Sequence, residues 1–163
     1  MTKTSHRIWK YGDNINTDVI FPGKYTYTIS QDPAQLARHA LEDLDPHFAS
    51  QARTGDVIVA GRNFGNGSSR EQAVTCLLAA GLRAVIAHSF ARIYYRNALN
   101  TGLLAIECPA IVDCVATGEY LEIDMQSHEI WAGGRAFPFT PLPPEVRAIL
   151  TAGGIIPWLT AQF

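Results

Sequence analysis

Residues 56–71 read DVIVAGRNFGNGSSRE, a segment that predicts a strand, a turn and the start of a helix. Its first six residues form a short β-branched run that predicts a buried strand, and residues 72–80 are good helix formers. The glycine-rich turn between them carries two serines and an arginine. The first backbone N–H groups of a helix have no internal partner and carry about half a positive charge, so such a turn favours an anionic ligand. A carboxylate substrate would fit there.

The common phosphate and nucleophile motifs do not match this turn. A dinucleotide-binding fingerprint needs a glycine or alanine where Arg70 stands, and a P-loop needs a lysine that the turn lacks. A nucleophile elbow needs a glycine two residues after its serine, and neither serine has one. The open alternative is a tight turn in which Ser68 or Ser69 caps the helix, with Glu71 or Gln72 completing a capping box.

The strand, turn and helix begin a β-α-β-α run. The pattern predicts a helix over residues 70–80, a strand over 84–88 and a helix over 90–99. Such a run implies two parallel strands joined by a crossover helix. Parallel sheets bind ligands at the carboxyl ends of their strands, and the turn lies at one of these ends.

The first third of the chain adds two further elements. Residues 7–11 predict a strand, and residues 34–41 predict a helix that starts at Pro33 with Asp32 as its cap. Asp13 and Asn14, in the loop between them, are typical turn formers.

The last third predicts framework elements. Residues 120–124 alternate apolar and polar side chains, and residues 129–139 contain a Gly-Gly pair, which together indicate a hairpin. A helix follows from residue 144 to about residue 150, and Gly153 and Gly154 stop it. We expect one α/β domain over residues 1–163, with a partly parallel sheet.

Composition excludes several classes of function. The chain is 47% hydrophobic and 17% charged with a net charge of −2, and it has no basic run, which argues against nucleic acid or an anionic membrane as a partner. No apolar stretch approaches the roughly 20 residues that span a bilayer, and residues 1–10 lack the apolar core of a signal peptide. We expect a cytoplasmic protein.

The three cysteines do not form a metal motif. Cys76, Cys108 and Cys114 include no Cys-x-x-Cys pair, and an odd number does not indicate a disulfide framework. We expect them to be core thiols that bind no iron–sulfur cluster. The five histidines stand singly without metal-ligand spacing, so no metal is expected on this chain.

Three separated blocks of the sequence resemble one protein family. They are residues 11–22 (YGDNINTDVIFP), 65–72 (GNGSSREQ) and 87–97 (AHSFARIYYRN), in the order that the family has. The family is the small subunit of the isopropylmalate isomerase branch of the aconitase superfamily, and the resemblance extends from about residue 9 to residue 159. It implies the swivelling three-layer β/β/α domain of the aconitases.

The resemblance also implies roles for residues of the turn. Ser68 would be the base that removes a proton from the carbon next to a carboxylate, and Asp18 would be a buried aspartate near the active arginine. Gly67 and Ser69 would contact the substrate. We expect Arg70 to bind the substrate carboxylate, because a guanidinium holds a carboxylate through two parallel hydrogen bonds.

Simpler roles remain open for two of these residues. Arg70 could be a surface arginine paired with Glu71 or Glu42, and Ser69 could be a helix cap. Ser68 needs more than a helix end to act as a base, because a helix terminus contributes about 0.3–1 kcal/mol and one pKa unit corresponds to about 1.4 kcal/mol. We therefore expect a partner protein to close the site and exclude water.

Residues 89–100 are expected to serve mainly the structure. Phe90, Ile93, Tyr94 and Ala98 have the spacing of one apolar helix face. The two arginines of this segment are expected to bridge elements or subunits and not to contact substrate.

Substrate choice is expected to reside in residues 22–28. Relatives that accept an extra carboxylate tend to have an arginine in this loop, and isopropylmalate enzymes tend to have leucines. Here Tyr25, Thr26 and Tyr27 provide neither. Because a second distal carboxylate would stay unpaired, the loop favours isopropylmalate or a smaller alkylmalate, such as dimethylmalate or citramalate.

The resemblance implies a hydro-lyase subunit of leucine biosynthesis that isomerises a hydroxy-dicarboxylate by dehydration and rehydration. A separate large subunit would carry the [4Fe–4S] cluster. Asn66 and Gln72 depart from the family, which often has cysteine and histidine at these positions. The alternative is a carboxylate-binding or regulatory module that keeps the fold and performs no chemistry.

Overall fold

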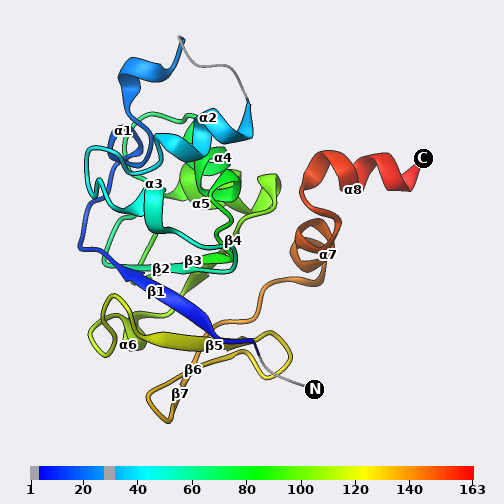
Figure 1. The fold of residues 1–163 in the computed structure, drawn as a ribbon. Helices are drawn as coiled ribbons and strands as arrows, with labels where there is room; N and C mark the ends of the chain where they lie inside the picture. The colour runs from blue at the N-terminus through cyan, green and yellow to red at the C-terminus, as the bar shows by residue number, and fades with distance from the viewer. Residues whose placement is uncertain (1–3, 28–31) are drawn as a thin grey trace.

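The sheet runs through the whole molecule. In the computed structural model, which describes residues 4–27 and 32–163, seven strands pair in the order β4-β3-β2-β1-β5-β6-β7 (Figure 1). The strands are β1 His6–Lys10, β2 Val57–Ala60, β3 Ala84–Ala87, β4 Leu104–Glu107, β5 Tyr120–Asp124, β6 Glu129–Ala132 and β7 Arg135–Pro138.

Strand β1 joins a parallel half of the sheet to an antiparallel half. It pairs in parallel with β2, with Ile8 opposite Val57, and β3 and β4 continue the parallel half. Its other edge pairs antiparallel with β5, with Arg7 opposite Tyr120, and β6 and β7 follow as the predicted hairpin. The expected partly parallel α/β fold is therefore confirmed.

The helices lie mostly over the parallel half, where Figure 1 shows α2, α4 and α5 together on one side. The helical elements are α1 Thr17–Ile20, η1 Gly23–Tyr25, α2 Pro33–Arg38, α3 Phe48–Gln51, α4 Gln72–Ala79, α5 Arg92–Thr101, α6 Pro109–Val112, α7 Pro144–Ala152 and α8 Ile155–Gln162.

Helix α2 is shorter than the sequence predicts. It starts at Pro33 with Asp32 in the N-cap position, as expected, but it ends at Arg38 and does not reach residue 41. Leu41 is fully buried, has a φ of 56°, and donates its backbone N–H to the carbonyl of Ile20 at 2.8 Å. Because a left-handed residue cannot continue an α-helix, this tertiary contact ends the helical conformation.

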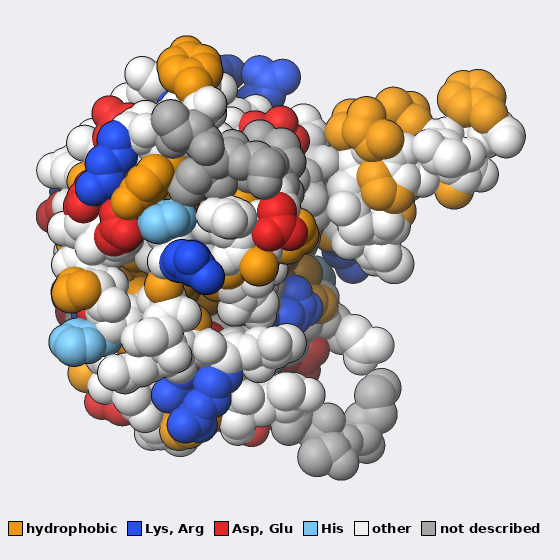
Figure 2. All heavy atoms as spheres, turned by 45° about the horizontal axis from the view of Figure 1, so that its top comes forward, with side chains coloured by type: hydrophobic (Ala, Val, Ile, Leu, Met, Phe, Trp, Pro, Cys, Tyr) orange, Lys and Arg blue, Asp and Glu red, His pale blue; other side chains and the backbone are white. Residues whose placement is uncertain are grey.

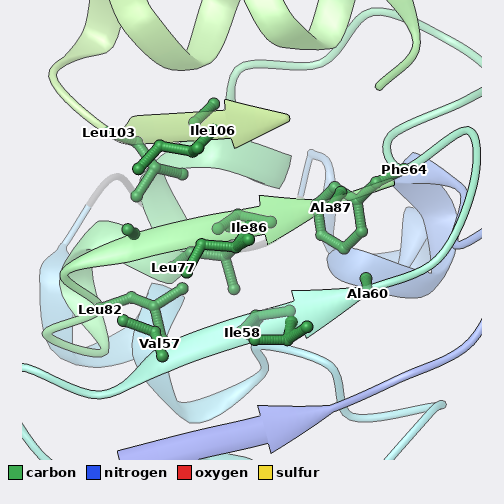
Figure 3. Packing of buried hydrophobic residues seen from close by; sticks show 14 of the residues in the cluster. Val57, Ile58, Ala60, Phe64, Leu77, Leu82, Ile86, Ala87, Leu103 and Ile106 are labelled. Carbon is green, nitrogen blue, oxygen red and sulfur yellow. The ribbon is translucent and has the colours of Figure 1, made fainter. Parts of the chain in front are cut away.

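The core lies between the parallel strands and the helices above them. All four residues of β2 and of β3 are buried, which explains their continuous apolar sequence. Ile58, Ile86 and Leu77 pack closely in Figure 3. Phe64, directly after β2, is fully buried and meets the ring of Tyr94 edge-on, with centroids 5.4 Å apart. This contact ties the turn after β2 to α5.

Helix α7, which starts at Pro144 as expected, and helix α8 lie at the periphery of the fold. Neither contains a buried residue, and α8 projects from the body with Ile156 69% exposed (Figures 1 and 2). A Cβ on Gly102 would lie 2.6 Å from the carbonyl oxygen of Gly153, so glycine permits the α5 and α7 ends to meet. None of the helices in the described part of the chain is long and apolar enough to cross a lipid bilayer.

Candidate active site

The glycine-rich turn has the conformation that its glycines predict. Gly65 has a φ of 85° and Gly67 a φ of 95°, values that side chains other than glycine rarely adopt. A Cβ on Gly65 would lie 2.2 Å from Cγ of Tyr94, so only glycine allows this turn to contact α5. The turn is also held against residues 15–17, because the N–H of Gly65 donates to Ile15 at 2.7 Å and that of Thr17 donates to Asn66 at 2.9 Å.

Ser68 is exposed at a cavity. Its carbonyl accepts a hydrogen bond of 2.8 Å from Oγ1 of Thr17, while its own hydroxyl makes no hydrogen bond with the described residues. It lines a cavity of about 190 Å³ together with Gly67 and Ser69. The side chain is therefore fixed through its backbone and available to a ligand.

The capping alternative for the two serines is wrong. Helix α4 begins at Gln72, its N-cap residue is Glu71, and no side chain caps it. Instead, Oγ of Ser69 accepts a hydrogen bond of 3.0 Å from Nδ2 of Asn97 on α5. This bond closes one wall of the cavity.

The guanidinium of Arg70 donates hydrogen bonds to residues between positions 17 and 26. Its Nη1 donates to Oγ1 of Thr26 at 2.7 Å, and its Nη2 donates to the carbonyls of Thr17, at 2.8 Å, and Phe21. Nη2 also lies 3.1 Å from Oδ1 of Asp18. The suggested pairing with Glu71 or Glu42 is not observed among the described residues.

The Nε donor of Arg70 has no partner in the described part of the chain. Its side chain is 13% exposed, and its Nε is buried without a hydrogen-bond partner among the described residues. An unsatisfied buried donor costs about 1–3 kcal/mol, so an acceptor that reached Nε would be bound favourably. Arg70 also lines the cavity beside Ser68.

Asp18 does not have the environment implied by the resemblance. Its side chain is 67% exposed, whereas a buried aspartate was expected. It is the first-turn acidic residue of a four-residue helix capped by Asn16, which orients it toward the surface next to Arg70. The proximity to the arginine is as predicted, and the burial is not.

Helix α5 contributes to the cavity, which was not predicted from its sequence. Arg92, Ile93 and Asn97 line it, although this helix was expected to serve the structure. Ile93 is 58% exposed and does not belong to the buried face formed by Tyr94 and Ala98. Asn97 follows Ile93 by four residues, which places both on one helix face, so a polar residue one turn after Ile93 was the available signal.

The described residues of the expected substrate loop lie beside Arg70 but do not line the cavity. Thr26 contacts the guanidinium, and Nε2 of the buried Gln72 lies 3.4 Å from the carbonyl of Thr26. Tyr25 packs on His39 with ring centroids 4.0 Å apart, and Tyr27 is 96% exposed. Residue 28, the last of the expected loop, lies outside the described residues.

The cysteines do not fit an iron–sulfur cluster. Cys76 and Cys108 are buried, and burial raises the pKa of both thiols, which disfavours the thiolate that binds iron. Cys114 is exposed in the turn after α6, so the expectation of a core thiol is wrong for this residue. No group of three or more His, Cys, Asp or Glu residues capable of holding a metal ion occurs in the described ranges.

Residues 7–111 match the aconitase C-terminal domain family, and the chain belongs to this family. It is 46% identical over 158 residues to the 3-isopropylmalate dehydratase small subunit of Thermodesulfovibrio yellowstonii, covering 96% of this chain and 93% of the relative. It is 47% identical over 156 residues to the protein of the same name from Halothermothrix orenii, covering 94% and 93%.

A solved structure supports the same grouping. The crystal structure of 3-isopropylmalate dehydratase from Methanocaldococcus jannaschii superposes with a TM-score of 0.90 at 42% identity, covering 97% of this chain and 93% of that one. The resemblance stated from the three sequence blocks is therefore confirmed, and with it the swivelling α/β fold of the aconitase superfamily.

Proposed function

We propose that this chain is the small subunit of a 3-isopropylmalate dehydratase, a hydro-lyase of leucine biosynthesis. The enzyme would isomerise its 2-alkylmalate substrate by removing water and adding it back. The observation that carries the proposal is the Ser68 hydroxyl, unpaired at a cavity beside Arg70, in a chain 46% identical to a dehydratase small subunit.

Ser68 is the proposed base. Its exposure and its fixed backbone suit a group that must reach a substrate proton. A serine hydroxyl is a weak base in water, so the site needs a second protein that covers the cavity and strengthens the local electrostatics. This requirement supports a chain that is active only in a heteromeric complex.

Arg70 is the proposed ligand of the substrate carboxylate. Its free Nε and its position at the cavity support this role, and Asp18 and Thr26 orient its guanidinium. Gly67 and Ser69 belong to the same wall of the cavity. Their backbone and hydroxyl groups would complete the binding of the carboxylate.

The partner is proposed to be a large subunit that carries a [4Fe–4S] cluster. The two buried thiols and the separate Cys114 do not suit the cluster, so its ligands must come from the other chain. We place the complex in the cytoplasm, where biosynthetic enzymes of this kind act on small hydroxy acids.

The proposed substrate is 3-isopropylmalate or a smaller alkylmalate. Tyr25, Thr26 and Tyr27 offer no cation for an additional carboxylate, and among them Thr26 is the residue that contacts the guanidinium of Arg70. A small alkyl group requires no such partner.

The test is the Ser68→Ala variant, assembled with the large subunit. We expect turnover to fall by about 10²- to 10⁴-fold, as is typical for loss of a catalytic base, and the thermal unfolding midpoint to stay unchanged. Ser50→Ala is the matched control and should retain full activity, because Ser50 is an exposed serine on α3, outside the cavity. Near-normal turnover by Ser68→Ala would refute the assignment.

The alternative without chemistry has a different outcome. A carboxylate-binding module would bind a dicarboxylate tightly and give no unsaturated intermediate with any cluster-bearing subunit. Following the absorbance of that intermediate during reconstitution separates the two functions.

A further inference from the structure

A second cavity lies away from the proposed active site. It has a volume of about 210 Å³, and Arg83 and Arg147 both line it. Arg83 directly precedes β3, and Leu104, the first residue of β4, also lines the cavity. Because β2, β3 and β4 are parallel, this cavity lies at the edge of the sheet opposite the turn that carries Ser68.

The two guanidinium groups have no counter-charge. Neither Arg83 nor Arg147 makes a side-chain hydrogen bond or an ion pair with any described residue, and no acidic side chain lines the cavity. Asp124, the acidic neighbour of Met125 in sequence, accepts hydrogen bonds from the backbone of the turn that follows it. Two like charges therefore share one cavity, and their repulsion would be relieved by an anion.

A charged acceptor would give both cations strong hydrogen bonds. Arg83 and Arg147 are exposed residues, and partial burial of the Arg83 guanidinium lowers its pKa. No described residue supplies such an acceptor to the Arg83 side chain. Only the backbone N–H of Arg83 donates to a protein group, the carbonyl of Asp56.

Apart from Thr151, the remaining side chains that line the cavity are apolar. Leu104 is buried, and Met125 and Leu150 are partly buried and packed against the core. The cavity is smaller than the about 300–1,000 Å³ that drug-sized ligands occupy, which restricts it to a small molecule. The close contact of Gly102 with Gly153 fixes the end of α7 against α5 and so supports the cavity.

We propose that this cavity binds a small carboxylate that bears an apolar group, with Arg83 and Arg147 on the carboxylate and Leu104, Met125 and Leu150 on the apolar part. The site is separate from the proposed active site, so its ligand would not compete with the substrate for space. This proposal does not depend on the proposed function.

The test uses the full chain and three probes. The probes are 4-methylpentanoate, its neutral amide and inorganic phosphate, followed by amide chemical shifts and by calorimetry. We expect 4-methylpentanoate to shift the signals of residues near Arg83, Leu104 and Thr151. The amide should bind at least about tenfold more weakly, because hydrogen bonds to a charged group contribute about 1.5–3 kcal/mol.

Variants identify the cations. Arg83→Gln and Arg147→Gln should each weaken 4-methylpentanoate binding by about tenfold. Arg38→Gln, an exposed arginine on α2, is the matched control and should leave binding unchanged. Circular dichroism confirms that each variant is folded.

Four results would overturn the proposal. They are absence of saturation by about 10 mM carboxylate, equal binding of the amide, an equal effect of Arg38→Gln, and shifts confined to the cavity around Ser68. Tighter binding of phosphate than of the carboxylate would overturn the part assigned to the apolar walls.

Discussion

Oγ1 of Thr26 accepts a hydrogen bond of 2.7 Å from Nη1 of Arg70, across 44 residues of sequence. The bond connects the expected substrate loop to the turn that carries Ser68. Because Arg70 is also held by the carbonyls of Thr17 and Phe21, its guanidinium has one orientation only while the loop stays in place. The loop therefore controls the arginine that is proposed to bind substrate.

Thr26→Val should weaken substrate binding in the assembled enzyme. The valine keeps the shape of threonine but removes the acceptor of Nη1, and a hydrogen bond to a charged group contributes about 1.5–3 kcal/mol. We expect KM to rise by about tenfold, with a smaller change in kcat. Thr26→Ser keeps the hydroxyl and should leave KM close to the wild-type value; an equal rise of KM in both variants would contradict a specific role of the hydroxyl.

Gly65→Ala should destabilise the protein by about 2 kcal/mol or more, through a left-handed backbone and overlap with Tyr94. Chemical denaturation measures the change. Gly118→Ala is the control, because Gly118 has a φ of 93° but no atom within 4 Å of its Cβ position. It should cost about 1 kcal/mol, from backbone strain alone. Equal losses in the two variants would contradict the contact with Tyr94.

Asp56→Asn should destabilise the junction between β1 and β2. Oδ2 of the buried carboxylate accepts from Arg7 at 2.8 Å, from Trp9 at 2.9 Å and from the N–H of Arg53 at 2.9 Å. Because Arg7 is partly exposed, we expect a loss of about 2–4 kcal/mol, slightly below the range for a fully buried pair. Urea unfolding followed by tryptophan fluorescence gives the value, and a loss below about 0.5 kcal/mol would contradict it.

The same carboxylate should make stability depend on acid pH. Burial raises the pKa of Asp56, but the bonds from Arg7, Arg53 and Trp9 outweigh burial and hold it below its ordinary value. A lowered folded-state pKa means that the stabilisation is complete above the unfolded pKa of about 4 and is lost as the pH falls through the folded value. The Asp56→Asn variant should lose less stability than the wild type below about pH 4; parallel curves would assign the acid sensitivity to other groups.

Cys114 should be the cysteine that reacts first with a thiol reagent. It is exposed, whereas Cys76 and Cys108 are buried and burial raises the pKa of their thiols. Mass spectrometry after brief alkylation of the native protein should find the label on Cys114. Denaturation should expose the other two thiols to the reagent. Early labelling of Cys76 would contradict the packing around α4.

Local sequence predicts the elements well because their signals are local. The β-branched runs of β2 and β3 are buried on both faces, and the glycine pairs mark the turns that they were expected to form. Helix α2 was predicted too long because its end depends on the contact of Leu41 with Ile20, which no local pattern contains.

The candidate site was predicted less completely. Its turn and Ser68 follow from the sequence, but the partners of Arg70 come from residues 44, 49 and 53 positions away. The exposure of Ile93 also depends on how α5 packs, since its spacing alone fits the buried face. Cys114 was likewise expected in the core, but it lies in an exposed turn, and its exposure depends on how that turn packs.

The central position of β1 has a consequence for biosynthesis. Its two neighbours are β2, where Ile8 meets Val57, and β5, where Arg7 meets Tyr120. On the ribosome this early strand emerges long before β5, and the edge that β5 covers stays open to other chains until then. Assembly therefore waits for a late segment, a topology that slows folding and gives nascent polypeptides time to associate wrongly.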